Sequence, residues 1–227
     1  GEVLAGDAQL REDRLRLRMI RVQKNRFGPT DELGIFEMTS KGLIEVGNPA
    51  GLFLSQRTEN TSGSVIMPAI EGSRIFLVEI QALTVPTKAD FTKRTFSGID
   101  PSRANIILAV VERRAGVSLW QNDILINCMG GMKVYEVAAD LAIALGVISS
   151  AKDYVIPHDM IVFGELGLSG EVRAIANPER RILQAKQLGF TRCILPEHNA
   201  SQVSGMKGIQ LIPVKTIRDA IRAIGQK

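Results

Sequence analysis

The feature that most constrains the fold is a mostly apolar strand that runs into two glycines and then into a stretch of helical periodicity. Residues 123–129 form the strand, Gly130 and Gly131 follow, and residues 134–150 repeat apolar side chains with a helical period. A strand, a tight turn and a helix make up the local unit of α/β proteins. Such a turn exposes backbone N–H groups at a helix N-terminus, where anions bind well. This one contains no Ser, Cys or Thr that could serve as a nucleophile.

The rest of the chain after residue 63 also alternates between the two periods. A hairpin is expected around Glu71 and Gly72. Asp100 and Pro101 suit the first positions of a helix, and Gly116 suits its end. Asn177 is expected to cap a later helix. The remaining predicted elements are strands at 160–163, 170–175, 191–195 and 209–214, and helices at 177–189 and 216–224. The pattern predicts an α/β fold with one substantial core.

The first part of the chain has a different pattern. Residues 14–22 alternate basic and apolar side chains, and residues 33–38 and 42–46 are short apolar runs around turns, as in strands. Residues 55–63 contain no aliphatic side chain and are typical of a linker. About 55 residues are too few for a convincing core of their own. We therefore predict two regions, 1–58 and 59–227, the first being the edge of a larger sheet.

Composition narrows the functional classes. The chain has 227 residues, of which 45% are hydrophobic and 23% charged, and its net charge is +4. No apolar run approaches the length of a membrane span, and the N-terminus has no signal-peptide pattern. Because there is no initiator Met, we expect a piece of a longer protein. Cys128 and Cys193 lie in apolar runs and are expected to be buried thiols of a cytoplasmic protein, and two histidines are too few for a zinc site.

A basic stretch is the main candidate binding surface. Residues 86–114 hold six cationic side chains against three acidic ones. The cationic residues are Lys88, Lys93, Arg94, Arg103, Arg113 and Arg114. Aromatic residues lie close to the pair at 93–94, and with no base-reading motif we expect contacts to nucleic-acid phosphates without sequence preference. The alternatives are a solvated loop and, for the last two arginines, complementation of a helix dipole. Trp120 and the methionines Met129, Met132 and Met160 are expected to fill the core or an interface.

Residues 64–227 resemble the proteolytic domain of Lon proteases. The resemblance rests on the Gly130–Gly131 turn with its helix, on residues 164–175 and on the helix after Asn177. It implies a Lon-like α/β fold. The positions of the family's catalytic Ser and Lys fall on Glu136 and near Glu179, so the resemblance implies no catalytic residue and no peptidase activity. The two carboxylates could instead form a new acid–base pair, but complementing helix dipoles is the simpler interpretation.

The stretch Lys24-Asn25-Arg26-Phe27-Gly28 is a basic loop after a basic strand. Physical reasoning alone leaves a phosphate contact with another subunit and a solvated turn equally open. The stretch is similar to the signature motif of the RadA (Sms) family, and the resemblance covers essentially the whole chain. It implies that region 1–58 is the β-rich C-terminal edge of a RecA-like ATPase domain. Lys24 and Arg26 would then act at a subunit interface on a neighbour's nucleotide or on coupling to DNA.

The resemblance implies a role in the whole protein: ATP-dependent DNA repair and branch migration by a hexameric ring, with DNA and, as a candidate, RecA recombinase as partners. The chain lacks a phosphate-binding G-x-x-x-x-G-K-[ST] loop and the family's four-cysteine zinc finger. ATP with magnesium, and zinc, are therefore expected in the full-length protein and no cofactor in this chain. Two other functions are open: a Lon-type Ser/Lys peptidase, and a ring-forming module without DNA contact.

Overall fold

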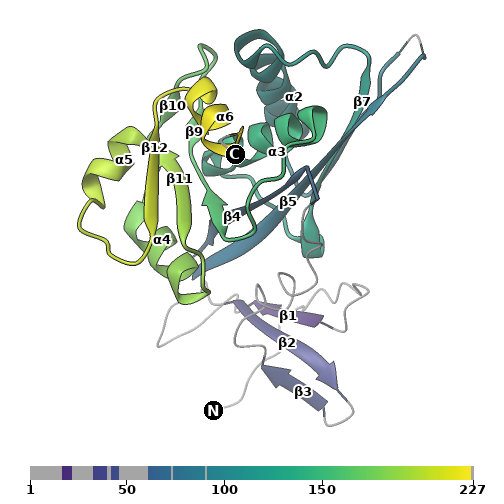
Figure 1. The fold of residues 1–227 in the computed structure, drawn as a ribbon. Helices are drawn as coiled ribbons and strands as arrows, with labels where there is room; N and C mark the ends of the chain where they lie inside the picture. The colour runs from purple at the N-terminus through teal and green to yellow at the C-terminus, as the bar shows by residue number, and fades with distance from the viewer. Residues whose placement is uncertain are drawn as a thin grey trace.

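The computed structural model describes residues 17–21, 33–39, 42–45, 61–72, 74–89 and 91–225 (Figure 1). In chain order, its strands are β1 (Leu17–Arg21), β2 (Leu33–Thr39), β3 (Gly42–Glu45), β4 (Ser64–Glu71), β5 (Arg74–Pro86), β6 (Arg94–Ser97), β7 (Asn122–Cys128), β8 (Met160–Val162), β9 (Glu165–Leu166), β10 (Val172–Arg173), β11 (Arg192–Pro196) and β12 (Gln210–Val214). Its α-helices are α2 (Pro101–Val110), α3 (Asp140–Lys152), α4 (Pro178–Gln187), α5 (Glu197–Gln202) and α6 (Ile217–Gly225). The predicted α/β class is confirmed.

The main sheet has seven strands in the order β12-β11-β8-β4-β5-β7-β6. Strands β12, β11, β8 and β4 run parallel, β5 is antiparallel to both β4 and β7, and β6 is parallel to β7. The predicted hairpin is confirmed: β4 and β5 pair from Ser64 opposite Gln81 to Glu71 opposite Arg74. Gly72 in the turn has a φ of +58°, a conformation that glycine adopts without strain.

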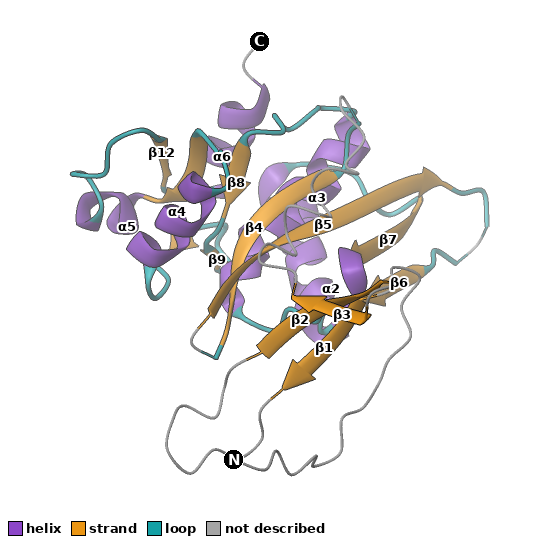
Figure 2. Cartoon of the chain, turned by 90° about the horizontal axis from the view of Figure 1, so that it is seen from below, coloured by secondary structure: helices purple, strands orange, loops and turns teal. Residues whose placement is uncertain are grey.

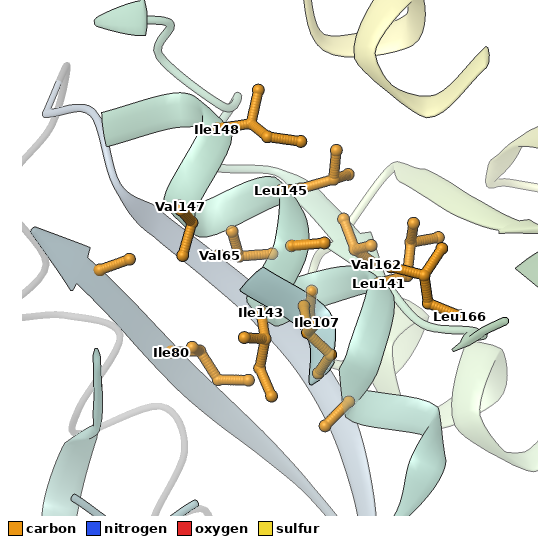
Figure 3. Packing of buried hydrophobic residues seen from close by; sticks show 14 of the residues in the cluster. Val65, Ile80, Ile107, Leu141, Ile143, Leu145, Val147, Ile148, Val162 and Leu166 are labelled. Atoms are coloured by element: carbon orange, nitrogen blue, oxygen red, sulfur yellow. The ribbon is translucent and has the colours of Figure 1, made fainter. Parts of the chain in front are cut away.

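Helices cover both faces of this sheet. β4 is buried at six consecutive positions because its neighbouring side chains point to opposite faces, each of which is covered. Val65 and Met67 enter a core with α2, α3 and α6, whereas Ile66 enters a second core with α4. Figure 3 shows the first core, where Ile143 and Leu145 of α3 pack among side chains of the sheet and of α2.

Helix α3 is the centre of the fold. Its residues 140–149 are all buried, because β4 and β5 lie on one side of it and α2 and α6 on the other. A helix that is apolar around its whole circumference needs such cover on all sides. The carbonyl of Gly164 accepts the N–H of Leu141 at 3.0 Å, which joins the start of α3 to the strand end after β8.

The helix predicted at 101–115 is confirmed, with one local change. The side chain of Asp100 accepts the N–H of Arg103 at 2.7 Å, and Pro101 takes the first helical position. The last turn, Val111–Ala115, is a π-helix, and it ends at Gly116 with a left-handed φ of +70°.

The helix predicted from residue 134 begins later, at Asp140. Val134 is extended, bridges to Ile99 in parallel and donates its N–H to Gly98 at 2.8 Å. A 3₁₀ turn, Val137–Ala139, then leads into α3. Val134 and Ala138 are buried in this segment before α3, so their apolar side chains extended the predicted helix too far towards the N-terminus.

Three smaller expectations were wrong or incomplete. Residues 170–175 are not one strand, because β9 and β10 form a short antiparallel hairpin. Asn177 has a left-handed φ of +56° and makes no capping hydrogen bond with its side chain. Helix α5 was not predicted, since its six residues, EHNASQ, carry almost no apolar period.

The strands predicted in the first region are present among the described residues. β1, β2 and β3 form a separate antiparallel sheet in that order, which Figure 2 shows apart from the long β4–β5 hairpin. The boundary near residue 58 stays a prediction, and the motif at residues 24–28 lies outside the described residues.

Candidate functional site

Two of the predicted DNA-contacting residues lie on an exposed loop between β5 and β6. Lys88 and Lys93 are both exposed, and Phe91 between them is 86% exposed. The loop backbone is fastened to the start of β7: the N–H of Lys93 donates to Asp123 Oδ1 at 2.7 Å, and its carbonyl accepts from Ile124 at 2.9 Å. Trp120 is also exposed, which rules out the core position considered for it. The loop thus presents cations and aromatic surface to solvent on a fixed backbone.

Arg94, the neighbour of Lys93, is half-buried and makes internal hydrogen bonds. Its guanidinium donates hydrogen bonds to the carbonyls of Asn122 and Leu119, the latter at 3.2 Å. The side chain therefore closes the turn that leads into β7. Contact of this guanidinium with DNA would have to compete with these bonds.

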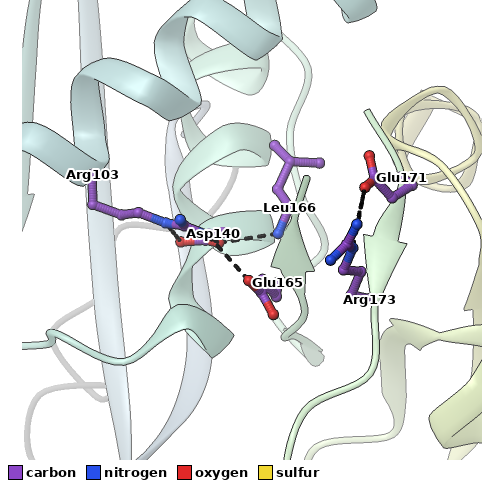
Figure 4. Close-up of polar contacts among 6 residues, drawn as sticks. All are labelled: Arg103, Asp140, Glu165, Leu166, Glu171 and Arg173. Carbon is purple, nitrogen blue, oxygen red and sulfur yellow. Dashed lines mark hydrogen bonds and ion pairs between the residues drawn. The ribbon is translucent and has the colours of Figure 1, made fainter. Parts of the chain in front are cut away.

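Arg103 is bound to a buried carboxylate (Figure 4). Asp140 is 1% exposed, and its Oδ1 accepts Arg103 Nε at 2.9 Å. The second oxygen, Oδ2, accepts Arg103 Nη2 and the N–H of Leu166, the latter at 3.0 Å. Glu165 adds a longer ion pair with the same guanidinium at 3.7 Å. The hydrogen bonds that Arg103 donates to Asp140 raise the pKa of Arg103, and the network joins α2, α3 and β9.

Arg113 and Arg114 end the π-helical turn and are both exposed. Arg114 Nε donates to the carbonyl of Leu168 at 3.1 Å, and the carbonyl of Arg114 accepts Arg218 Nε at 2.9 Å. This end of the turn is therefore joined to the β9–β10 hairpin and to α6. The six cationic residues thus divide into a solvent-facing set (Lys88, Lys93 and Arg113) and a set with internal bonds (Arg94, Arg103 and Arg114).

Glu136, at the position of the protease nucleophile, binds an arginine. Its Oε1 accepts the N–H of Ile70 at 2.8 Å and Arg181 Nη1 at 3.0 Å, and its Oε2 accepts Arg181 Nη2 at 2.5 Å. Both oxygens are engaged in structural bonds. Glu136 is the N-cap of the 3₁₀ turn that leads into α3, and its side chain makes no capping hydrogen bond there.

Arg181 is the important residue of this region that the sequence did not reveal. It is 2% exposed, and it also donates to the carbonyls of Pro68 and Ala176 at 2.5 and 3.1 Å. One guanidinium thus joins β4, the turn before α3 and the start of α4. A guanidinium stays protonated in proteins and cannot act as a general base. A signal was available, since Arg181 shares the buried face of α4 with Ile182 and Ala185.

Glu179 is exposed in the first turn of α4, where its charge complements the helix dipole. The strong partner of Glu136 is Arg181. In the described part of the chain, the arrangement at these positions is therefore a structural ion pair, and it supplies neither an alkoxide nor a neutral amine.

The cysteines are buried and free, as expected. Burial raises the pKa of Cys128 to about 12 and that of Cys193 well above its ordinary value, so both thiols stay protonated. Within residues 61–72, 74–89 and 91–225, no three His, Cys, Asp or Glu side chains are grouped as metal ligands. Nor does any helix in the described ranges have the length and apolar character of a membrane span.

Comparison with known proteins identifies the chain. A family model described as subunit ChlI of Mg-chelatase matches residues 99–199. DNA repair protein RadA of Chlamydia pneumoniae is 47% identical over 209 residues, which are 91% of this chain and 46% of that protein. The proteins of the same name from Pseudomonas aeruginosa and Escherichia coli K12 are 44% and 42% identical over 92% and 96% of this chain, and 46% of each relative is covered.

The fold therefore defines an α/β protein with a mixed, mostly parallel sheet. At this identity and coverage of the chain, it belongs to the RadA family. The chain spans about half the length of the relatives that it matches.

Proposed function

We propose that this chain is the scaffold and DNA-contacting part of a longer protein that acts in DNA repair. Its relatives are named DNA repair proteins, which supports the general role. The observation that carries the proposal is the β5–β6 loop, where Lys88 and Lys93 face solvent on either side of the exposed Phe91.

The chemistry of this loop suits the DNA backbone. Lysine ammonium groups bind phosphates as point charges and carry no sequence information by themselves. The nearby exposed aromatic rings of Phe91 and Trp120 offer apolar faces on which an unpaired base can stack. We therefore expect binding that depends on salt and tolerates any sequence.

The remaining arginines have a different role in the proposal. Arg94, Arg103 and Arg181 keep the loop and the helices in place through bonds to carbonyls and carboxylates. Arg113 extends the cationic surface from the end of the π-helical turn.

At the level of the whole protein, we propose an ATP-driven motor for branch migration that works as a homo-oligomeric ring. RecA recombinase is a candidate partner. Lys24 and Arg26 would act across the subunit interface, where a cation stabilises charge that develops on a phosphate. ATP with magnesium, and zinc, would bind to parts of the longer protein outside this chain. The buried free cysteines suit the reducing cytoplasm.

Duplex DNA binding by the variant Lys88→Ala/Lys93→Ala tests the DNA contact. Fluorescence anisotropy at low salt should show weaker binding than for the wild type. The matched control is Lys152→Ala/Lys207→Ala, which removes two exposed lysines elsewhere and should bind nearly as the wild type does. Equal loss in both variants would show only a general charge effect, and no binding by the wild type would leave the chain as a scaffold.

The motor proposal has a separate test in the full-length protein. Lys24→Ala should reduce DNA-stimulated ATP hydrolysis and branch migration while nucleotide binding persists. Normal activity of this variant would contradict the assigned role of Lys24.

A further inference from the structure

Trp120 is the only tryptophan of the chain, and its side chain is 66% exposed. Isolated apolar side chains on a surface need no explanation. This one differs in two ways, because its turn is bonded to several neighbouring elements and because it lies beside the lysine-bearing β5–β6 loop. These features describe an aromatic surface that is held ready for a ligand.

The turn that carries Trp120 is fixed at both of its ends. The N–H of Asn122 donates to the carbonyl of Leu119 at 3.1 Å, which closes a turn with Trp120 at its centre. Leu119 is buried in the core, and its N–H donates to Glu112 Oε1 at 3.1 Å. The backbone on either side of the indole is therefore held in place.

Arg94 binds the same turn from β6. Its guanidinium donates to the carbonyls of Leu119 and Asn122, so one planar group holds residues on both sides of Trp120. A side chain on such a fixed backbone loses little freedom when it binds a ligand, which favours binding. Arg94 thereby positions Trp120.

The turn and the β5–β6 loop lie at one end of the sheet, where β5 and β7 run side by side (Figure 1). The N–H of Thr87, at the start of the loop, donates to the carbonyl of Gln121 at 2.9 Å. At the end of the loop, the N–H of Lys93 donates to Asp123 Oδ1 at 2.7 Å. Both ends of the loop are therefore bonded to residues that directly follow Trp120 in the chain.

The charges near the turn favour a base over a phosphate at Trp120. Two carboxylates lie beside the turn, because Glu112 and Asp123 each accept a backbone N–H there. A phosphate at this place would be repelled, whereas a base is uncharged and stacks on an aromatic face. In an intact duplex the neighbouring bases cover that face. The indole is therefore suited to bases that are unpaired.

We propose that Trp120, with the exposed ring of Phe91, stacks on unpaired bases, so that this site selects single-stranded or partly unpaired DNA over intact duplex. Lys88 and Lys93 bind the phosphates of the same strand, and Arg94 holds the indole in place. The proposal rests on the DNA contact of the β5–β6 loop proposed above.

The fluorescence of the single tryptophan reports on this site alone. A base that stacks on the indole should quench the emission, so a single-stranded thymine oligonucleotide should quench it and a blunt duplex of the same length should not. Fluorescence anisotropy of labelled DNA measures binding under the same conditions. Binding of the single strand that leaves the emission unchanged, or equal quenching by the duplex, would overturn this inference and leave the lysine contact standing. No binding of either DNA would overturn both.

Substitution of the indole gives a second measurement. Trp120→Ala should weaken binding of the single strand by about tenfold, the size of one base–aromatic stack, and binding of the duplex by less than about twofold. Trp120→Phe should keep most of the affinity, because its ring still stacks. The matched control is Tyr135→Ala: Tyr135 is also 66% exposed, but it follows Val134, which bridges to Ile99 beyond the other end of β6. Equal losses in Trp120→Ala and Tyr135→Ala would contradict the stacking role.

Arg94→Lys tests the positioning role. The variant keeps the positive charge, but an ammonium group lacks the planar fork that holds two carbonyls. Quenching by the single strand should therefore fall, while the slope of log affinity against log salt stays as in the wild type. Circular dichroism checks that the variant is folded. Unchanged quenching would show that Arg94 does not position Trp120.

Discussion

The arginines around α3 and the lysines of the β5–β6 loop carry the same charge and have opposite surroundings. Arg181 is buried, and its guanidinium is bound to Glu136 and to backbone carbonyls on separate elements. Lys88 and Lys93 are exposed on a loop whose backbone, and not its side chains, makes the internal bonds. A buried cation is retained only with full partners, whereas an exposed one remains available to a ligand.

This difference shows how a basic stretch should be interpreted. The count of six cations against three acids suggested one continuous surface, but Arg94 and Arg103 belong to the scaffold by their contacts. The hydrogen-bond and ion-pair partners of each side chain are what distinguish the scaffold arginines from the loop lysines. The predictions below test that separation, since scaffold residues should affect stability and loop residues should affect binding.

The largest effect is expected at Arg181. Replacing it with Ala leaves the Glu136 carboxylate and two carbonyls without their donor, and should lower the free energy of unfolding by about 3–5 kcal/mol. Urea denaturation measures this change. The control is Arg180→Ala, on the exposed side of the same helix, which should change stability far less. Equal effects of the two substitutions would contradict the scaffold role of Arg181.

A smaller loss is expected at Arg103. Asp140 keeps the N–H of Leu166 when Arg103 is replaced by Ala, so the loss should be about 2–3 kcal/mol. A double-mutant cycle with Asp140→Asn should give a coupling energy above roughly 1 kcal/mol. Additive effects in the cycle would mean that the ion pair does not hold α2 to α3.

Acid should weaken the fold through Asp159. The hydrogen bond from Arg192 lowers the pKa of Asp159 to about 2, below its ordinary value of 3.8. The folded state therefore favours the carboxylate, and this stabilisation is complete above the ordinary value and is lost as the pH falls towards 2. The loss should be roughly 1–2 kcal/mol. Asp159→Asn should remove that part of the pH dependence, and an unchanged pH profile would contradict it.

The smallest effect on stability is expected at Lys88 and Lys93. Both side chains lie in solvent, so the double Ala variant should unfold within about 0.5 kcal/mol of the wild type. Urea denaturation tests this directly. A loss comparable to that of Arg103→Ala would place the lysines in the scaffold and remove the contrast.

Much of the fold could be predicted from local pattern. The β4–β5 hairpin follows from apolar runs on either side of Glu71 and Gly72, and the start of α2 follows from Asp100 and Pro101. These signals lie within a few residues of the structure they specify. The start of α3 was predicted wrongly, because an extended buried segment that includes Val134 has the same apolar character as a helix face.

The partners of the charged side chains could not be predicted. Arg181 and Glu136 are 45 residues apart in sequence, and Arg103 and Asp140 are 37 apart. The neighbouring sequence does not determine which carboxylate a given guanidinium binds, because that depends on how the helices pack on the sheet. The resemblance placed Glu136 at the position of the protease nucleophile. In the folded protein its carboxylate instead forms an ion pair with Arg181.

The most direct test of the contrast between scaffold and loop is the salt dependence of duplex DNA binding by the wild type and by Lys88→Ala/Lys93→Ala. Each phosphate contact contributes about −0.9 to the slope of log affinity against log salt, so the double variant should be shallower by about 1.8. That result, with stability unchanged, would assign the lysines to DNA. Identical slopes for the two proteins would contradict the account and move the DNA contact elsewhere.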